Sequence, residues 1–334
     1  MRRQPEHPGV QQLDRRSVWV GRALLVPVWV IVAMLLALAA GHVIAYDRSR
    51  AVMLADAYTL WVFLPAYVVL VAALCFRTWS LALVAAVIVA AHLAWVVPTT
   101  LHTVTVTAAA REAPHVRVAS ANLRYDNTDH GPLLAELGAS HADIIVVEEV
   151  TPAWWRAIRS SGLLASHPDT AKALRDDPGG MAILSRLPLE DVVVHRAGGW
   201  PIITATVHVA GRALHLGGVH LVAPLETFAR NQRAQRAITS IAASMPRPRL
   251  VIGDFNASPY NRWFDQMLGL GLRDAHQAVG RPFATTWPNG MHRLPPLLLD
   301  HAFVDRSVVP VAVREGRGRG SDHRPIVVDL AVER

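Results

Sequence analysis

Residues 251–256 read Val-Ile-Gly-Asp-Phe-Asn and residues 320–326 read Gly-Ser-Asp-His-Arg-Pro-Ile, so each stretch sets a carboxylate beside an apolar, strand-like run. In the first stretch, Asp254 and Asn256 are two residues apart, and strand alternation sends both side chains to the same side. In the second, the residue before the proline is biased toward extended geometry, which holds the Asp-His pair at the mouth of a strand. Both stretches therefore predict polar side chains at the ends of strands.

The sequence around these stretches predicts one α/β domain over residues 115–334. The runs expected to form strands are mostly rich in Val, Ile or Leu and are bounded by Gly, Pro or Asp. They cover residues 116–121, 143–149, 181–185, 203–209, 213–221, 250–254, 298–304 and 325–332. Many of them follow one another without an intervening helix, which argues against a simple doubly wound sheet. We therefore predict a two-sheet α/β-sandwich flanked by helices.

Three long runs without Asp, Glu, Lys or Arg precede this domain. Each is at least as long as the roughly 20 residues that a helix needs to cross a bilayer. The predicted segments are three transmembrane helices at 23–46, 57–76 and 79–97, which form a membrane anchor over 23–97, and a linker at 98–114. A cleaved signal peptide explains only the first run. Buried core helices of this length normally carry a polar stripe, and these runs have none.

The arginines predict how the anchor is oriented. Residues 1–22 contain five of them, so the positive-inside rule makes this N-terminal tail cytoplasmic. Three crossings then place the 115–334 domain outside the cytoplasm, although Arg48 and Arg50 in the first loop weigh against this orientation. A transporter function is an alternative interpretation of the three spans. However, they contain no Asp, Glu, Lys or Arg, only His42 and His92, whereas transport paths usually carry charges within the membrane.

The net charge of +7 suggests nucleic acid at first, but its distribution argues otherwise. Residues 1–100 contain eight arginines and four acidic residues, which is +4 of the total and leaves +3 for residues 101–334. A domain that binds duplex DNA by charge carries a denser basic face. The single cysteine, Cys75, excludes a cysteine-rich zinc site.

Further polar residues end predicted strands of the same domain: Asn122, Glu149, His220 and Asp300. Each one alone is weak, because an acid that closes a strand is often a helix cap or a turn residue. Pro152, which starts a helix just after Glu149, favours that interpretation for Glu149. His301 is expected to be an ordinary histidine, because alternation points it away from Asp300. Together, the oxygen-rich set without cysteine is typical of a Mg²⁺ or Mn²⁺ site.

The full set resembles the endonuclease/exonuclease/phosphatase superfamily, which has the DNase I-like fold. It comprises Asn122, Glu149, His220, Asp254, Asn256, Asp300, Asp322 and His323. Gly-Met-Ala-Ile-Leu-Ser-Arg at 180–186 and Thr-Trp-Pro at 286–288 are similar to further family motifs, and the resemblance covers residues 115–332. The chain departs from the family at Glu148, where Gln is frequent. Three spans before such a domain resemble a bacterial subgroup that includes teicoplanin-resistance membrane proteins.

The resemblance implies a divalent metal, Mg²⁺ or Mn²⁺, held by Glu149 and Asn122 together with Asp322. It leaves open whether Glu148 joins that site. The metal would stabilise negative charge on the phosphate oxygens.

The resemblance also implies a catalytic group. Asp254 would be the general base that takes a proton from the attacking water, and Asn256 would position that water or the phosphate. His323, oriented by Asp300, would contact the non-bridging oxygens as charge builds on them. His220 would face the phosphate from another side.

These features predict a membrane-anchored phosphoester hydrolase that acts outside the cytoplasm, with no protein partner inferred. A lipid-linked phosphate or diphosphate is favoured as substrate, because the anchor holds the domain near lipid headgroups. An extracellular nuclease is the alternative, and it would need a basic groove with stacking aromatics. The candidate stackers are Trp154, Trp155, Trp200 and Trp263. Core or interface roles are favoured for these tryptophans. A non-catalytic binding or sensor protein on the same scaffold is a further class. The presence of residues at all the catalytic positions argues against it.

Overall fold

The computed structural model describes residues 9–225, 227–290 and 293–333. The chain divides into two compact units. The helical unit comprises Met1–Ala45 and Thr59–Ala94, and the sandwich unit comprises Tyr46–Tyr58 and Trp95–Arg334. The predicted N-terminal tail is described only from Gly9, so its first eight residues lie outside the described chain.

The helical unit consists of apolar helices. In chain order they are α1 (Gly9–Ala45), α3 (Thr59–Val62), α4 (Leu64–Cys75) and α5 (Trp79–Val96), and a 3-10 turn at Val97–Thr100 follows α5. Two stretches within the described chain are long and apolar enough to cross a membrane, Leu25–Ala45 and Trp79–Thr100.

The expectation of three uninterrupted membrane helices is wrong in the middle of the anchor. The predicted span 57–76 is broken into α3 and α4, and Thr59–Cys75 is bent by 73° from α2 (Arg50–Ala57). Pro65 lies in the first turn of α4. Because proline lacks an N–H and its ring clashes with the preceding turn, a regular helix does not continue through it.

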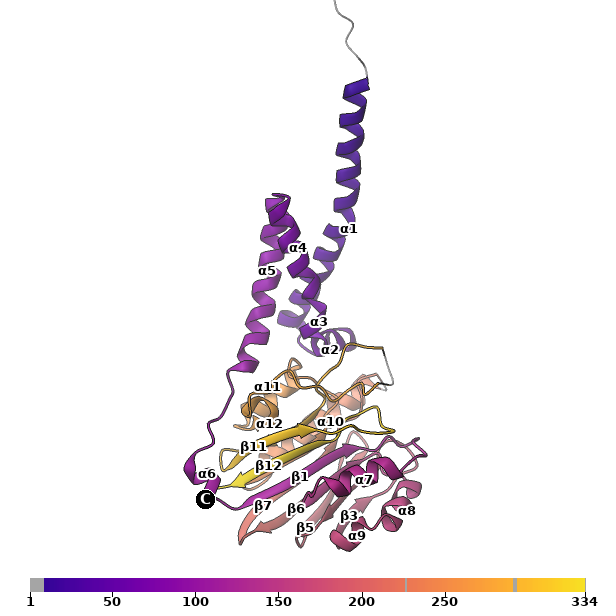
Figure 1. Cartoon of the computed structure of the whole chain (residues 1–334), viewed down its shortest axis with the longest axis vertical. Coiled ribbons are helices and arrows are strands. Elements are labelled where there is room, and N and C mark those ends of the chain that lie inside the picture. Colours follow the sequence, from indigo (N-terminus) through magenta and orange to yellow (C-terminus); the bar gives the residue numbers. More distant parts are fainter. Residues whose placement is uncertain (1–8, 226, 291–292, 334) are drawn as a thin grey trace, which may run out of the picture. The chain divides into compact units, whose positions relative to one another are not determined.

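The sandwich unit contains two β-sheets, as the sequence predicts (Figure 1), and each sheet has six strands. The first has the order β11-β12-β1-β2-β4-β3, and the second has the order β5-β6-β7-β8-β10-β9. The strands of the first sheet are β1 (His115–Asn122), β2 (Ile144–Glu148), β3 (Asp169–Ala173), β4 (Met181–Ser185), β11 (Val308–Glu315) and β12 (Ile326–Val332). Those of the second are β5 (Glu190–Ala197), β6 (Trp200–Val209), β7 (Arg212–His220), β8 (Arg249–Asp254), β9 (Arg273–Asp274) and β10 (Asp300–Val304).

Helices cover the outer faces of both sheets, and an apolar core fills the space between the sheets. The inner core includes Val146, Ile183 and Ile252, all fully buried. On the first sheet lie α7 (Gly131–Ala139), α8 (Pro152–Ser160) and α9 (Leu163–Ser166). On the second lie α10 (Phe228–Ser244) and α11 (Arg262–Gly269). The remaining short helices are α6 (Ala108–Glu112) and α12 (Ala275–Ala278).

Strand register brings the predicted site residues to one edge of the sandwich. β7 and β8 are parallel with His220 opposite Asp254, and β8 and β10 are antiparallel with Asp254 opposite Asp300. In the other sheet, β1 and β2 are parallel with Asn122 opposite Glu148. The place of the polar residues therefore follows from where neighbouring strands end together.

Candidate active site

The Asp254 carboxylate lies at the centre of the predicted set. Its Oδ2 accepts a hydrogen bond from Asn122 Nδ2 at 3.1 Å and lies 3.4 Å from Asn256 Nδ2. The Nε2 atoms of His323 and His220 approach the same oxygen at 3.5 and 3.6 Å. Asn122 comes from the first sheet and His220 from the second, so the site forms where the two sheets meet.

Burial and neighbouring positive charge have opposite effects on the pKa of Asp254, which is 1% exposed. Burial raises the pKa of its carboxyl group, and the nearby Asp300 adds to this, whereas His323 and His220 oppose it. A carboxylate in this situation is a stronger base than one in water. Asp254 Oδ1 also accepts a hydrogen bond from the backbone N–H of Asn256 at 2.8 Å, which fixes the plane of the carboxylate.

His323 lies next to Asp254 and is held in its protonated form. Its Nδ1 lies 2.9 Å from Asp300 Oδ2, and its backbone N–H donates to Ser321 Oγ at 3.0 Å. Burial would lower the pKa of His323, but the carboxylates of Asp300 and Asp254 outweigh it and raise that pKa well above the usual value. His323 is therefore an imidazolium at neutral pH, with its Nε2 directed toward Asp254.

His220 has the opposite character. Burial lowers its pKa, despite the favourable charges of Asp254 and Asp300. The Trp200 ring packs on it with a centroid distance of 4.6 Å. The two histidines of the site thus present one neutral and one cationic ring.

Glu149 and Asp322 are the carboxylates that could hold a metal. Glu149 has a φ of +62°, and its two oxygens accept hydrogen bonds from Asn122 Nδ2 at 3.0 Å and from the Tyr125 backbone N–H at 2.8 Å. Asp322 accepts from Trp287 Nε1 at 3.1 Å. Burial raises the pKa of Glu149, and the charge of Asp322 contributes to the rise.

The donor set fits a hard divalent cation. The charges of four acidic side chains, Glu149, Asp254, Asp300 and Asp322, interact with His323. In the part of the chain that the structure describes, Asp300 Oδ1 is buried without a hydrogen-bond donor. Oxygen ligands of this kind suit Mg²⁺ or Mn²⁺. Asn122, the third residue predicted to hold the metal, accepts the backbone N–H of Arg124 through Oδ1 at 2.9 Å, and its Nδ2 bridges Glu149 and Asp254.

Residues 119–323, more than half of the chain, match the sequence model of the Endonuclease/Exonuclease/phosphatase family. The chain belongs to this family. Among curated proteins, none matches the sequence.

Solved structures of the family share its DNase I-like fold with this chain. D. rerio TDP2, in complex with a single strand DNA product, superposes with a TM-score of 0.55 at 18% identity over 65% of this chain and 99% of its own. The endonuclease/exonuclease/phosphatase from Beutenbergia cavernae has a TM-score of 0.55 at 19% identity, over 66% and 72%. The 3'-5' exonuclease from Neisseria meningitidis has a TM-score of 0.54 at 20% identity, over 65% and 100%. At these identities the likeness shows the fold alone.

Glu148 lies behind the site. It is fully buried, and its Oε1 accepts a hydrogen bond from Ser120 Oγ at 2.7 Å. Burial raises the pKa of its carboxyl group well above the usual value. Its contacts are with Ser120 and with the backbone near Gly253, whereas Glu149 is held by Asn122 and Tyr125.

Three supporting residues escape sequence reasoning, and each acts through a contact distant in the chain. Ser321 Oγ donates to the Asn122 carbonyl at 2.7 Å and so joins β1 to the loop that carries His323. Thr286 Oγ1 accepts from the Asp300 backbone N–H at 3.2 Å. Trp200 packs on His220. Ser321 lies in the Gly-Ser-Asp-His stretch and Thr286 in the Thr-Trp-Pro motif, but neither motif predicts these contacts.

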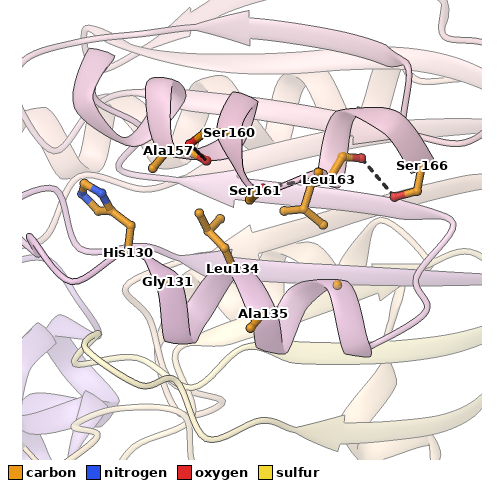
Figure 2. Close-up of a pocket in the computed structure, with 11 residues that line it drawn as sticks. His130, Gly131, Leu134, Ala135, Ala157, Ser160, Ser161, Leu163 and Ser166 are labelled. Carbon is orange, nitrogen blue, oxygen red and sulfur yellow. Dashed lines mark hydrogen bonds between the residues drawn. The ribbon is translucent and has the colours of Figure 1, made fainter.

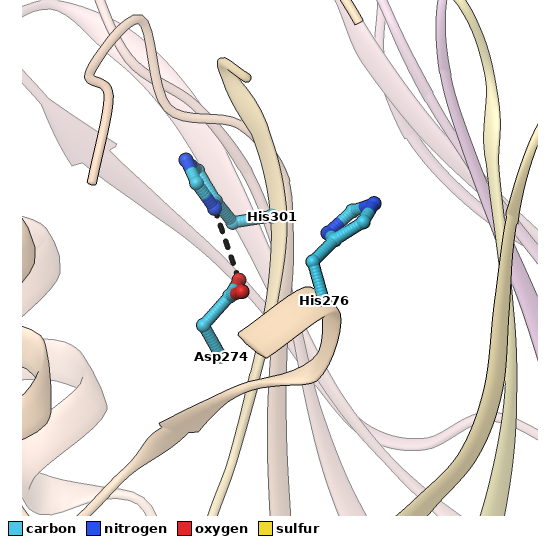
Figure 3. Close-up of side chains that lie close together, drawn as sticks. All are labelled: Asp274, His276 and His301. Atoms are coloured by element: carbon cyan, nitrogen blue, oxygen red, sulfur yellow. Dashed lines mark hydrogen bonds and ion pairs between the residues drawn. The ribbon is translucent and has the colours of Figure 1, made fainter. Parts of the chain in front are cut away.

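A second cluster of ionisable groups consists of Asp274, His276 and His301 (Figure 3). His301 Nδ1 lies 3.0 Å from Asp274 Oδ2, and its Nε2 lies 3.0 Å from the Ala257 carbonyl. His276 Nε2 lies 3.2 Å from Glu315 Oε1. His301 does point away from Asp300, as alternation predicts, but it is a buried link between β9, β10 and the loop after β8 rather than an ordinary histidine.

A hollow of about 550 Å³ lies between α7 on one side and α8 and α9 on the other (Figure 2). Small and apolar side chains such as Leu134, Ala157 and Leu163 line most of it. Its lining residues, all in the described part of the chain, include none of the predicted site residues. The predicted site residues therefore lie at the strand ends and not in this hollow.

Proposed function

We propose that this protein is a membrane-anchored, divalent-metal-dependent phosphoester hydrolase that acts outside the cytoplasm. Family membership supports the phosphoester chemistry, because proteins of this family are metal-dependent phosphodiesterases and nucleases. The observation that carries the proposal is the convergence of Asn122, His220 and His323 on Asp254 Oδ2.

In the proposed reaction, Asp254 takes a proton from water as the water oxygen bonds to phosphorus. The P–O bond to the leaving group breaks, and its electron pair stays on the leaving oxygen. The imidazolium of His323 and the neutral ring of His220 donate hydrogen bonds to phosphate oxygens as negative charge builds on them. Asn256 and Asn122 keep the Asp254 carboxylate in place.

Glu149 and Asp322, together with Asn122, are the residues proposed to hold Mg²⁺ or Mn²⁺. When bound, such an ion neutralises charge on the phosphate and polarises its oxygens. Asn122 supports the site by orienting Glu149 through its Nδ2.

A lipid-linked phosphate or diphosphate is the proposed substrate class, since the apolar helices would hold the domain at a membrane surface. A nuclease is the second candidate, and the similarity to TDP2 in complex with a single strand DNA product and to the Neisseria 3'-5' exonuclease favours it. The stacking platform that a nuclease would use has little support here. Trp154, Trp200 and Trp263 are all buried, which leaves Trp155 as the accessible member of the predicted group.

Hydrolysis by the full-length protein in detergent tests the proposal. Polyprenyl diphosphate, phospholipid and DNA are offered with Mg²⁺ or Mn²⁺, and then with a chelator. We expect turnover of a lipid-linked substrate that the chelator abolishes, and a loss of roughly 100-fold or more in Asp254→Asn. Asp176→Asn makes the same chemical change at an exposed position and is the matched control.

Each contrary outcome removes one part of the proposal. Equal rates in Asp254→Asn and the unmodified protein would remove Asp254 as the base. Turnover of DNA alone would establish the nuclease. Binding of phosphoesters without any turnover would establish a non-catalytic binding protein.

A further inference from the structure

The segment Tyr46–Tyr58, which joins α1 to α3, belongs to the sandwich unit although apolar helices flank it on both sides in the sequence. We call it the interspan loop. Its Asp47 carboxylate accepts hydrogen bonds from the Arg262 backbone N–H at 2.7 Å and from Asn261 Nδ2 at 3.0 Å. Asn261 Nδ2 also donates to the Met53 carbonyl at 3.0 Å. The loop therefore contacts the sandwich at the start of α11.

These contacts are buried on both sides. Asp47 is 5% exposed, Met53 3% and Asn261 2%. Asp56 is also buried, and its Oδ2 accepts from the Asp47 backbone N–H at 3.3 Å. Acidic side chains are seldom buried unless they have partners, so a loop that merely lay nearby would keep them in water.

The loop supplies a helix cap that α11 lacks. Asn261 precedes α11 but makes no capping bond with its own side chain. Asp47 accepts from the first N–H of the helix instead, where a carboxylate is favoured by the helix dipole. The contact therefore stabilises α11 from a position 215 residues away from Arg262 in the sequence.

The capped helix packs directly beneath the active site. Trp263 of α11 stacks on Phe255 with a centroid distance of 4.9 Å, and both rings are buried. Phe255 lies between Asp254 and Asn256 in the chain. Support for α11 is thus support for the strand end that carries the proposed base.

We propose that the interspan loop is a structural part of the catalytic domain, docked through Asp47 on the start of α11, and that both therefore lie on the same side of the membrane. The chain from residue 59 to residue 94 must then leave that side and return to it. If only the 79–100 stretch crossed the membrane, the interspan loop and the domain would lie on opposite sides of it. The bent segment Thr59–Cys75 therefore crosses as well, and as helix it would measure about 25 Å against a hydrocarbon core of about 30 Å.

The docking of the interspan loop concerns folding and topology and does not depend on the proposed hydrolysis. Cysteine labelling of the full-length chain tests the topology. In a Cys75→Ser background, single cysteines are placed at the exposed positions of Arg48 in the loop, Arg111 in the domain and Arg77 between α4 and α5. A membrane-impermeant maleimide added to intact cells should either label both Arg48→Cys and Arg111→Cys or label neither of them. Arg77→Cys should give the opposite result. Labelling of Arg48→Cys and Arg111→Cys from opposite sides would overturn the inference.

Stability of the full-length protein in detergent tests the docking itself. Asp47→Ala should lower the unfolding midpoint and speed tryptic cleavage after Arg48 and Arg50, because the cap is lost. Asp47→Asn should recover part of the midpoint, since an amide oxygen also caps a helix. Arg48→Ala changes an exposed residue of the same loop and should leave the midpoint unchanged. An unchanged midpoint in Asp47→Ala would show that the docking does not contribute to stability.

Discussion

At the scale of single residues, the ion pair of Asp300 and His323 is the most consequential contact in the proposed site. Two carboxylates, Asp300 and Asp254, hold the imidazole in its charged form against the effect of burial, which by itself would lower the pKa of His323. Asp300 Oδ2 makes the direct contact at 2.9 Å. The charge on His323 is therefore a property of its neighbours and not of the histidine alone.

Asp300→Asn should lower activity and move the alkaline limb of the pH profile to lower pH. The amide keeps the shape of the side chain but removes a negative charge, so the pKa of His323 falls and its proton is lost at lower pH. We expect a loss of roughly 10²- to 10⁴-fold at neutral pH, the range for a lost acid–base group. The measurement is kcat/KM from about pH 5 to about pH 10. An alkaline limb that stays in place would contradict the assignment.

Gly253→Ala should be strongly destabilising. Gly253 has a φ of +149°, and a Cβ there would approach the Val219 carbonyl oxygen to 1.9 Å, within the backbone of the neighbouring strand. Overpacking of a core costs about 1–3 kcal/mol, and a clash with backbone should reach the top of that range or exceed it. The unfolding midpoint of the purified protein measures the effect. Gly131→Ala is the control, because nothing lies within 4 Å of a Cβ at Gly131.

At the scale of elements, the buried pair of Asp274 and His301 joins three parts of the second sheet. Asp274 ends β9, His301 lies in β10, and the Ala257 carbonyl belongs to the loop after β8. Burial would raise the pKa of Asp274, but the hydrogen bond from His301 and the charges of His301 and His276 bring it below the usual value. The pair therefore holds the loop next to Asn256.

Asp274→Asn should destabilise the protein by about 1–3 kcal/mol, because the buried hydrogen bond between Asp274 and His301 loses its charged acceptor. Because the pKa of Asp274 is lowered in the folded state, its contribution is present above the unfolded value of 3.8 and is lost as pH falls below that value. The difference in unfolding midpoint between variant and unmodified protein should therefore shrink in strong acid. A difference that is independent of pH would mean that the charge of Asp274 does not contribute.

Sequence patterns predict the central strands of this fold better than its edges. The strands that they miss, β3, β5, β9 and β11, are the outer strands of the two sheets. An edge strand is paired on one side only and tolerates polar residues, which weakens the apolar pattern of β3, β5 and β9. The run of β11 is apolar, but Pro310 interrupts it. In β5, for example, the first five residues are all exposed.

At the scale of the whole molecule, the docking of the interspan loop bears on where the catalytic domain begins. Composition places the boundary at residue 115, after a linker. The contacts of Asp47 with Asn261 and Arg262 place residues 46–58 in the same unit. A fragment that starts at residue 101 lacks these contacts.

The fragment 101–334 should accordingly be less stable than the sandwich in the full-length protein. Loss of the cap on α11 alone should cost about 0.5–2 kcal/mol, and the newly exposed apolar surface adds to this. Unfolding midpoints in the same detergent measure the difference, and a synthetic peptide of residues 46–58 should raise the midpoint of the fragment. Equal midpoints of fragment and full-length protein would contradict the expectation.

The sequence by itself determined the apolar character of the N-terminal helices, the two-sheet sandwich and the eight polar residues at the strand ends. These are local properties, written in the alternation and spacing of neighbouring residues. Only the tertiary structure decided that Asp254 Oδ2 is the centre of the site, that Glu148 lies behind it, and that Asp47 caps α11. Asn122 and Asp254 are 132 residues apart, and Asp47 and Asn261 are 214 apart. Contacts across such distances arise from strand register and packing, which no local pattern encodes.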